Sequence, residues 1–424
     1  MRDFFADTRK AAAVVFLAAL VLRLGFLWRQ GPPPVLLGDA VEYHAYAVHL
    51  LDTGSYTGLA ADRATRVPGY PLFLAAVFAA TGRSVPAALL AQCLLGAVTC
   101  VLLMGLTSEI LPFPWPVFAG LAAACYGGLV VPCAEPLSES LYSFFLVLSL
   151  RALYKSDWTP GRRALCFGAL SGYLYLIRPE PLPYIAATSL LLPRLFSRFT
   201  YRDTAKALAA AALVAGLWVG RNAVVFRRLI PASTVGKSVG YLSLHLPAHR
   251  LGLAPEPRHV PSAELGELAR DTDFGTAYKE LSGRLTWPQL ARCYVFNLAT
   301  ILYPFLPEYD WTYVLLIPFW LIGFILAVKR KELWPMAGSV VCSLGVFTFF
   351  GGPASRYRQG IAPFFILLAA AGAWSLAERA GASKFRRWGA AWLGVNLLIW
   401  IGQSQFRDLI LAVLDSAGVR GYTR

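Results

Sequence analysis

Stretches of mostly apolar residues recur along the whole chain, separated by connections that hold most of its charged residues. A helix needs about 20 predominantly apolar residues to cross a bilayer. The pattern therefore predicts an all-α polytopic membrane protein. Two shorter apolar segments, 70–82 and 286–306, are predicted to be helices at the membrane interface. About eleven transmembrane helices are predicted, at 11–30, 84–108, 113–131, 137–154, 163–179, 181–197, 205–221, 311–328, 334–350, 360–378 and 387–403.

The composition supports a membrane location. Of the 424 residues, 57% are hydrophobic and 15% are charged, whereas soluble domains have roughly 45–50% apolar and about 25% charged residues. The net charge of +15 is then interpreted as membrane topology and attraction to anionic lipid. No basic run interleaved with aromatic residues suggests nucleic acid as a partner.

Lys and Arg in short connections set the orientation, because these residues accumulate on the cytoplasmic side. Five basic ends or connections fall on one side if there are eleven spans: "MRDFFADTRK", "RALYKSDWTPGRR", "RLFSRFTYRDTAK", "KRKE" and "ERAGASKFRR". This side, with the N-terminus, is predicted to be cytoplasmic. The opposite, extracytoplasmic side, which is the periplasm or cell exterior in a bacterium, receives 31–83, the turns near 132–136 and 179–181, the long loop at 222–310, and "GGPASRYRQG".

The segment "GDAVEYHAYAVHLLDTGSY" begins where the first predicted span leaves the membrane on the outer side. Its apolar residues have helical spacing and predict an amphipathic helix that ends at Gly54. One interpretation makes Asp39 the N-cap and Glu42 the N3 residue of a capping box. A second makes Asp39 a general base towards an acceptor hydroxyl. The two interpretations are compatible. The apolar face is formed by Tyr43, Tyr46, Ala47, Leu50 and Leu51.

Further arginines and acids lie on the same outward side. Each arginine alone could place its charge among lipid headgroups. Together they suit a site that holds a lipid phosphate by Arg and deprotonates an acceptor with Asp or Glu. The residues predicted to bind the lipid phosphate or the group that it carries are Arg66, Arg178, Glu180, Arg221, Asn222, Lys237, Arg356 and Arg358. Acceptor contact or support of the site is predicted for Tyr43, Tyr70, Glu135 and Glu139.

Several other classes of site find no support in the sequence. The histidines have no metal-binding spacing such as HExxH, and there is no P-loop or dinucleotide fingerprint. We therefore expect neither a metal nor another cofactor. An internal repeat, which is typical of many secondary transporters, is also not seen.

Six segments occur in an order that resembles bacterial glycosyltransferase family 39, which has the GT-C fold and is related to protein O-mannosyltransferases and lipid A aminoarabinose transferase. The segments are "GDAVEYHAYAVHLLDTGSY", "RVPGYPLFLAAVFAATG", "SESLYSFFLVLSL", "IRPEPL", "LWVGRNAVVFRRLIPASTVG" and "SRYRQGIAPFFILLAAAG". The acidic first outer loop with its returning proline segment and the "RN" pair are the more specific of these. The proline segment departs from the "PP" of many relatives, since it reads "VPGYP" here.

The resemblance implies an inverting transfer of a sugar from a polyprenyl phosphate to an extracytoplasmic acceptor, which is a glycolipid, a polysaccharide or a protein. Asp39 would be the catalytic carboxylate, acting as a base, with Glu42 as helper, and Arg66 would engage the donor phosphate. The implied parts are a seven-span module at 1–221 with interfacial helices in its first outer loop at 31–83, a loop or lid at 222–310, and a variable membrane part at 311–424. The membrane would be the bacterial inner membrane.

Two alternatives come from other classes. A transporter or flippase of a lipid-linked sugar would carry ionisable residues deep within its spans. A non-catalytic lipid-binding or scaffold protein would keep its activity when Asp39 is replaced by Asn.

Overall fold

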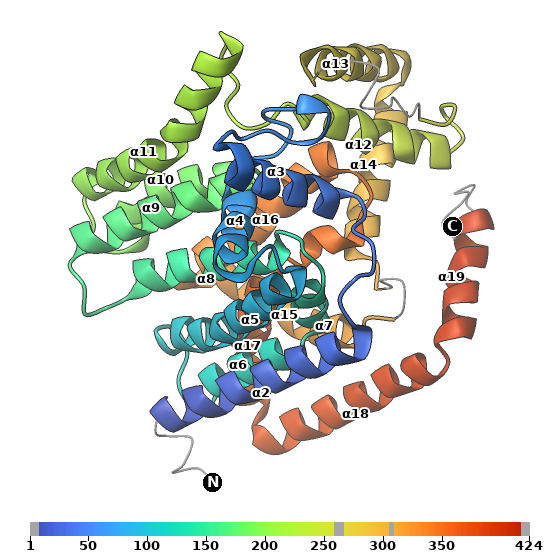
Figure 1. Cartoon of the computed structure of the whole chain (residues 1–424). Helices are drawn as coiled ribbons and strands as arrows, with labels where there is room; N and C mark the ends of the chain where they lie inside the picture. The colour runs from blue at the N-terminus through green and yellow to red at the C-terminus, as the bar shows by residue number, and fades with distance from the viewer. Residues whose placement is uncertain (1–7, 258–266, 305–308, 417–424) are drawn as a thin grey trace. The chain divides into compact units, whose positions relative to one another are not determined.

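The computed structural model describes residues 8–257, 267–304 and 309–416, which are almost entirely helical. Figure 1 labels the helices. Each of the eleven apolar segments predicted to be a span coincides with a helix or a broken pair of helices. The described part of the chain divides into two compact units, which are treated separately below. The all-α membrane fold expected from the sequence is confirmed.

The first unit takes in Met1–Ala232, Leu316–Ser343 and Gln359–Arg379. It contains all of the N-terminal helices and the parts of the C-terminal helices that fall within these ranges. Its helices up to residue 232 are α2 (Thr8–Gln30), α3 (Asp39–Thr53), α4 (Gly69–Thr81), α5 (Val85–Ser108), α6 (Trp115–Cys125), α7 (Gly127–Val130), α8 (Glu139–Tyr154), α9 (Pro160–Ile177), α10 (Leu182–Leu195) and α11 (Tyr201–Phe226), with short 3₁₀ turns at Leu59–Ala61 and Val131–Ala134.

Helix α5 is central to this unit and packs against α2, α6 and α8 (Figure 1). Helix α9 packs against α8 and, over its length, against α11. The α9–α11 contact is close because Gly168 and Gly172 face the backbone of α11: a Cβ on Gly168 would lie 2.1 Å from the carbonyl oxygen of Ala207. Small residues let helix backbones approach in this way within membranes.

In the part of the chain that the structure describes, five helices are long and apolar enough to cross a membrane: α2, α5, α11, α15 (Trp311–Lys329) and the Lys331–Gly351 segment. A sixth candidate is the broken pair Trp115–Cys125 and Gly127–Ala134, which bends by 69°. Helix α4, at 13 residues, is too short to span, as the sequence pattern indicated for 70–82. The chain is a multi-pass membrane protein, and the number of eleven spans stays a prediction.

The second unit takes in Ser233–Leu315, Leu344–Arg358 and Ala380–Arg424. The segment 222–310, predicted to be a loop or lid region with a helix at 286–306, contains a helix there and two further helices that were not predicted. The three share a small apolar core of Leu244, Ala248, Leu281 and Cys293. Tertiary packing against α13 and α14 stabilises α12, whose own amphipathic pattern is weak. The helices of this unit are α12 (Gly236–Arg250), α13 (Glu267–Arg284), α14 (Trp287–Leu302), α18 (Ala382–Ile401) and α19 (Gln403–Ser416).

The remaining C-terminal helices belong to the first unit wholly or in part. Helix α15 crosses the boundary between the units, and α16 (Trp334–Val346) is followed by a π-helical turn at Phe347–Gly351 and a 3₁₀ turn at Ser355–Arg358. Helix α17 (Ala362–Ala380) is buried along nearly its whole length. Its Gly372 lies against the α15 backbone, because a Cβ there would meet the carbonyl oxygen of Phe319 at 2.0 Å.

Candidate active site

Helix α3 begins and ends at glycines. Gly38 is the N-cap with φ of 55°, and Asp39 is the first helical residue. Gly54 ends the helix in the left-handed conformation with φ of 67°, as predicted. The capping-box interpretation is wrong, because the N-cap residue is Gly38 and it has no side chain to accept a hydrogen bond. The sequence suggested otherwise because Asp39 and Glu42 have the spacing of a capping box but stand one position too late in the chain.

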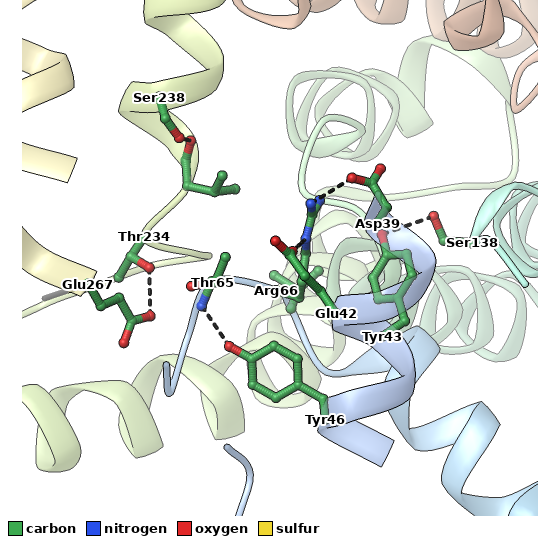
Figure 2. Close-up of polar contacts among 12 residues, drawn as sticks. Asp39, Glu42, Tyr43, Tyr46, Thr65, Arg66, Ser138, Thr234, Ser238 and Glu267 are labelled. Atoms are coloured by element: carbon green, nitrogen blue, oxygen red, sulfur yellow. Dashed lines mark hydrogen bonds and ion pairs between the residues drawn. The ribbon is translucent and has the colours of Figure 1, made fainter. Parts of the chain in front are cut away.

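The carboxylates of Asp39 and Glu42 both bind Arg66 (Figure 2). Arg66 Nη2 lies 2.7 Å from Asp39 Oδ1, and Arg66 Nε donates to Glu42 Oε2. All three side chains retain contact with solvent, with exposed fractions of 25% for Asp39, 32% for Glu42 and 20% for Arg66. The guanidinium uses the same edge, Nε and Nη2, for both acids. Its Nη1 donates to no other group among the described residues.

Two tyrosines hold the backbone on either side of Arg66. The Tyr46 hydroxyl accepts a hydrogen bond of 3.1 Å from the Thr65 amide (Figure 2). The Tyr56 hydroxyl donates to the carbonyl oxygens of Arg66 at 3.0 Å and Val67 at 3.2 Å. The two rings stack with centroids 4.4 Å apart. The loop before α4 is thereby tied to α3, which fixes Arg66 opposite the two acids.

The electrostatic surroundings keep Arg66 charged. Burial by itself would lower its pKa, but Tyr43, Asp39 and Glu42 outweigh this effect, and the pKa of Arg66 is raised. Burial also raises the pKa of Tyr43, although Arg66 and Arg178 oppose this. Tyr43 is therefore a neutral hydroxyl that lies within the field of both arginines.

Tyr43 connects this cluster to Ser138, the residue before α8. Its hydroxyl donates to Ser138 Oγ at 3.4 Å, and its ring packs edge-on against Tyr70 with centroids 4.9 Å apart. Tyr70 is fully buried and donates to Gln92 Oε1 at 2.6 Å. Gln92 Nε2 in turn donates to the carbonyl oxygen of Glu135 at 2.7 Å, whereas the Glu135 residue is itself exposed.

A second charged cluster follows Ser138. Arg178 Nη1 lies 3.0 Å from Glu139 Oε1, and Arg178 Nε lies 2.5 Å from Glu180 Oε1. The acids are largely buried, with exposed side-chain fractions of 5% for Glu139 and 9% for Glu180, and that of Arg178 is 16%. Both clusters have one guanidinium between two carboxylates, and the second is more strongly desolvated.

Arg221 and Asn222 lie within the last turns of α11. Arg221 donates to the carbonyl oxygens of Arg63 at 2.7 Å and Tyr56 at 3.1 Å. The side chain of Asn222 is buried and donates to the Ile230 carbonyl oxygen at 3.1 Å. Arg221 thus joins α11 to the loop that carries Arg66, and Asn222 orders the chain after α11.

Lys237, Arg356 and Arg358 belong to the second unit. Lys237 Nζ lies 3.3 Å from Asp271 Oδ2. Arg358 is fully buried, 2.8 Å from Asp310 Oδ2, and also donates to the carbonyl oxygens of Ile301 and Tyr303. These contacts give Arg358 a role in holding its own unit together. Arg356 is partly exposed beside the ring of Tyr357.

Sequence reasoning did not single out Ser138, Gln92 or Tyr56. Ser138 and Gln92 had no usable signal, because a Ser or Gln near a helix end is common in any membrane protein. Tyr56 stands two residues after the predicted helix end, and the signal available was its place between the acids and Arg66. For metals, no group of three or more potential side-chain ligands occurs among the described residues.

No protein-family model and no curated protein sequence matches the chain. Among solved structures, the oligosaccharyltransferase AglB from Archaeoglobus fulgidus, in complex with an inhibitory peptide and a dolichol-phosphate, is similar at a TM-score of 0.46 and 13% identity over 92% of this chain. ArnT from Cupriavidus metallidurans, bound to undecaprenyl phosphate, is similar at a TM-score of 0.41 and 12% identity over 89% of this chain and 79% of ArnT.

The chain spans about half the length of AglB, since the similarity covers 54% of that protein. The same oligosaccharyltransferase in its apo form is similar at a TM-score of 0.46 and 12% identity. With scores below 0.5, these similarities carry no argument about what the present chain binds or does.

Proposed function

We propose that this chain is an inverting glycosyltransferase of the GT-C fold that moves a sugar from a polyprenyl phosphate to an acceptor outside the cytoplasm. The observation that carries the proposal is the arrangement of Arg66, which binds Asp39 and Glu42 through one edge and leaves Nη1 without a partner among the described residues. The proposed base, Asp39, and the proposed cation for the leaving phosphate, Arg66, are therefore held together by an ion pair. The order of motifs that resembles glycosyltransferase family 39 supports the same reaction.

In the proposed reaction, Asp39 accepts the proton of the acceptor hydroxyl while the acceptor oxygen attacks the anomeric carbon of the sugar. The bond between this carbon and the phosphate oxygen breaks, and its electron pair leaves with the polyprenyl phosphate. The Nη1 edge of Arg66 neutralises the developing charge on the phosphate. If the acceptor is already anionic, Asp39 orients it instead. A single displacement of this kind inverts the anomeric carbon.

Glu42 is proposed to hold Arg66 in place through Nε, and Arg178 and Arg221 to contact the phosphate or sugar. Glu180, Asn222, Lys237, Arg356 and Arg358 stay predictions for the donor side, as Tyr70, Glu135 and Glu139 do for the acceptor side or for support of the site. The proposed location is a bacterial inner membrane with a cytoplasmic N-terminus and the site in the periplasm, which follows from the Lys and Arg distribution. The acceptor class is open among glycolipids, polysaccharides and proteins.

The test is a transfer assay with the purified protein in lipid and a panel of radiolabelled polyprenyl-phosphate sugars, with membrane extract as the acceptor source. We expect one donor to support turnover, and Asp39→Asn to lower the turnover about 10²–10⁴-fold while donor binding persists. Asp52→Asn is the matched control. Asp52 lies on the same helix and also pairs with an arginine, Arg83, but both side chains are about half exposed.

Two outcomes would overturn the proposal. Undiminished turnover in Asp39→Asn would remove Asp39 from the chemistry. Donor binding without transfer, combined with movement of the labelled lipid across sealed vesicles, would instead establish a flippase.

A further inference from the structure

Arg23 is a buried charge in the apolar helix α2 that the proposed reaction does not use. Its residue is 1% exposed. Its guanidinium donates to the carbonyl oxygens of Ala19 at 3.0 Å and of Ala123 and Ala124 at 3.4 Å, and to Cys100 Sγ at 3.4 Å. All four acceptors are neutral. A buried guanidinium without a carboxylate partner is strongly unfavourable inside a membrane protein, so a counter-charge is expected nearby.

Glu139 is the carboxylate that lines the same small pocket as Arg23, between α2, α5, α8 and the bend after α6. Arg23 Nε and Glu139 Oε2 are both buried, and neither has a hydrogen-bond partner among the described residues. Arg23 Nε is a hydrogen-bond donor, and Glu139 Oε2 is an acceptor. The pocket is also lined by hydroxyl side chains, namely Thr99, Ser140 and Ser143.

The charges of Arg178, Glu139 and Glu180 also indicate that Arg23 balances a carboxylate. Arg178 supplies one positive charge to two buried carboxylates, Glu139 and Glu180. This leaves one negative charge, which the positive charge of Arg23 balances. Arg23 Nε can only donate a hydrogen bond and the Glu139 carboxylate can only accept one, so a water molecule, which both accepts and donates, can join them. The pocket has room for about one water molecule.

We propose that Arg23 is a positioning residue of the site, linked to Glu139 by a water that accepts a hydrogen bond from Arg23 Nε and donates one to Glu139 Oε2. Glu139 is then held from both sides, by the water through Oε2 and by Arg178 through Oε1. The orientation of Arg178 therefore depends on a residue in the interior of α2. Arg178 is proposed to contact the donor phosphate or sugar, so an effect of Arg23 on donor binding rests on the proposed function. The link between Arg23 and Glu139 does not.

The link is tested by a double-mutant cycle on the thermal unfolding of the protein in lipid nanodiscs. Arg23→Gln leaves Glu139 unbalanced and lowers the unfolding temperature. Adding Glu139→Gln to Arg23→Gln is expected to lower it much less than Glu139→Gln does alone, or to raise it. Equal, additive losses would overturn the link. Arg163→Gln, which removes a buried arginine that donates to the carbonyl oxygen of Leu153, is the control and is expected to be additive with Glu139→Gln.

The positioning role is tested by the binding of undecaprenyl phosphate to the same nanodiscs. Arg23→Gln is expected to weaken binding about tenfold, and Arg23→Lys, which keeps the charge, to restore part of it. If Arg23 served stability alone, unfolding would change and binding would not, which would overturn the positioning role. If the wild-type protein does not bind the lipid, the proposed function fails, while the unfolding cycle still decides the link between Arg23 and Glu139.

Discussion

The guanidinium of Arg66 lies 2.7 Å from the carboxylate of Asp39, which stands 27 positions earlier in the chain. The same guanidinium also binds Glu42 through Nε. This relationship joins the two halves of the connection between α2 and α5, namely helix α3 and the segment that leads into α4. It also assigns the two edges of Arg66 to different tasks, since one edge holds acids and the other faces away from them.

Arg66→Lys is expected to weaken binding of undecaprenyl phosphate by about tenfold or more, because an ammonium group cannot bind two carboxylates and a phosphate in fixed directions at once. Isothermal titration calorimetry with the protein in nanodiscs measures this affinity. Arg83→Lys is the control. Arg83 also pairs with an acid of helix α3, Asp52, but at its exposed end and away from Asp39. Equal affinities of wild type and Arg66→Lys would contradict a direct role of the guanidinium.

Arg178→Gln is expected to destabilise the protein by about 3–5 kcal/mol, because it removes the direct ion-pair partner of two buried carboxylates, Glu139 and Glu180. Denaturation of the purified protein in lipid measures the loss. The double variant Arg178→Gln with Glu180→Gln should recover part of it, since one of the two charges is then removed. A loss that the second substitution does not relieve would mean that Arg178 acts through packing and not through charge.

Tyr56→Phe is expected to lower the transfer rate more than its loss of stability explains, because its hydroxyl holds the carbonyl oxygens of Arg66 and Val67. The two carbonyl oxygens share the single hydroxyl proton, so its loss is worth about 1 kcal/mol in total. Tyr175→Phe is a matched control, since Tyr175 donates to the carbonyl oxygen of Pro231 at 2.9 Å. Both variants should unfold at lower temperature, and only Tyr56→Phe should transfer more slowly. Parallel changes in rate would show that Tyr56 does not position Arg66.

Gly69→Ala is expected to separate the start of α4 from the end of α9. A Cβ at Gly69 would lie 2.7 Å from the backbone of Leu176 and Ile177, which must move to accommodate it. We expect a destabilisation of about 1–3 kcal/mol and slower transfer, because Arg66 precedes this contact and Arg178 follows it. Gly25→Ala, where a Cβ meets nothing within 4 Å, should be neutral or stabilising. Wild-type behaviour of Gly69→Ala in unfolding and transfer assays would show that the contact does not position the two arginines.

Much of the fold could be predicted because the signals are local. Apolar stretches of the right length gave the positions of the helices in the membrane part, and the run from Asp39 to Gly54 gave α3 with its end. Helix α12 was missed because its sequence has little periodicity, and α13 because its sequence is mostly polar; their core forms only when Leu244 and Leu281 come together. The capping box was a false signal because N-cap position depends on one backbone residue, Gly38, and not on the spacing of the acids.

The sequence by itself determined that the chain is helical, that it enters a membrane, and that acids and arginines gather in the segments between spans. These properties follow from hydrogen bonds within each helix and from the transfer of apolar side chains out of water, neither of which needs distant residues. The tertiary structure decided which partners the charges have: Arg66 with Asp39 and Glu42, Arg178 with Glu139 and Glu180, and Arg358 with Asp310. An ion pair depends on the distance between its groups in space, and packing of separate helices sets that distance.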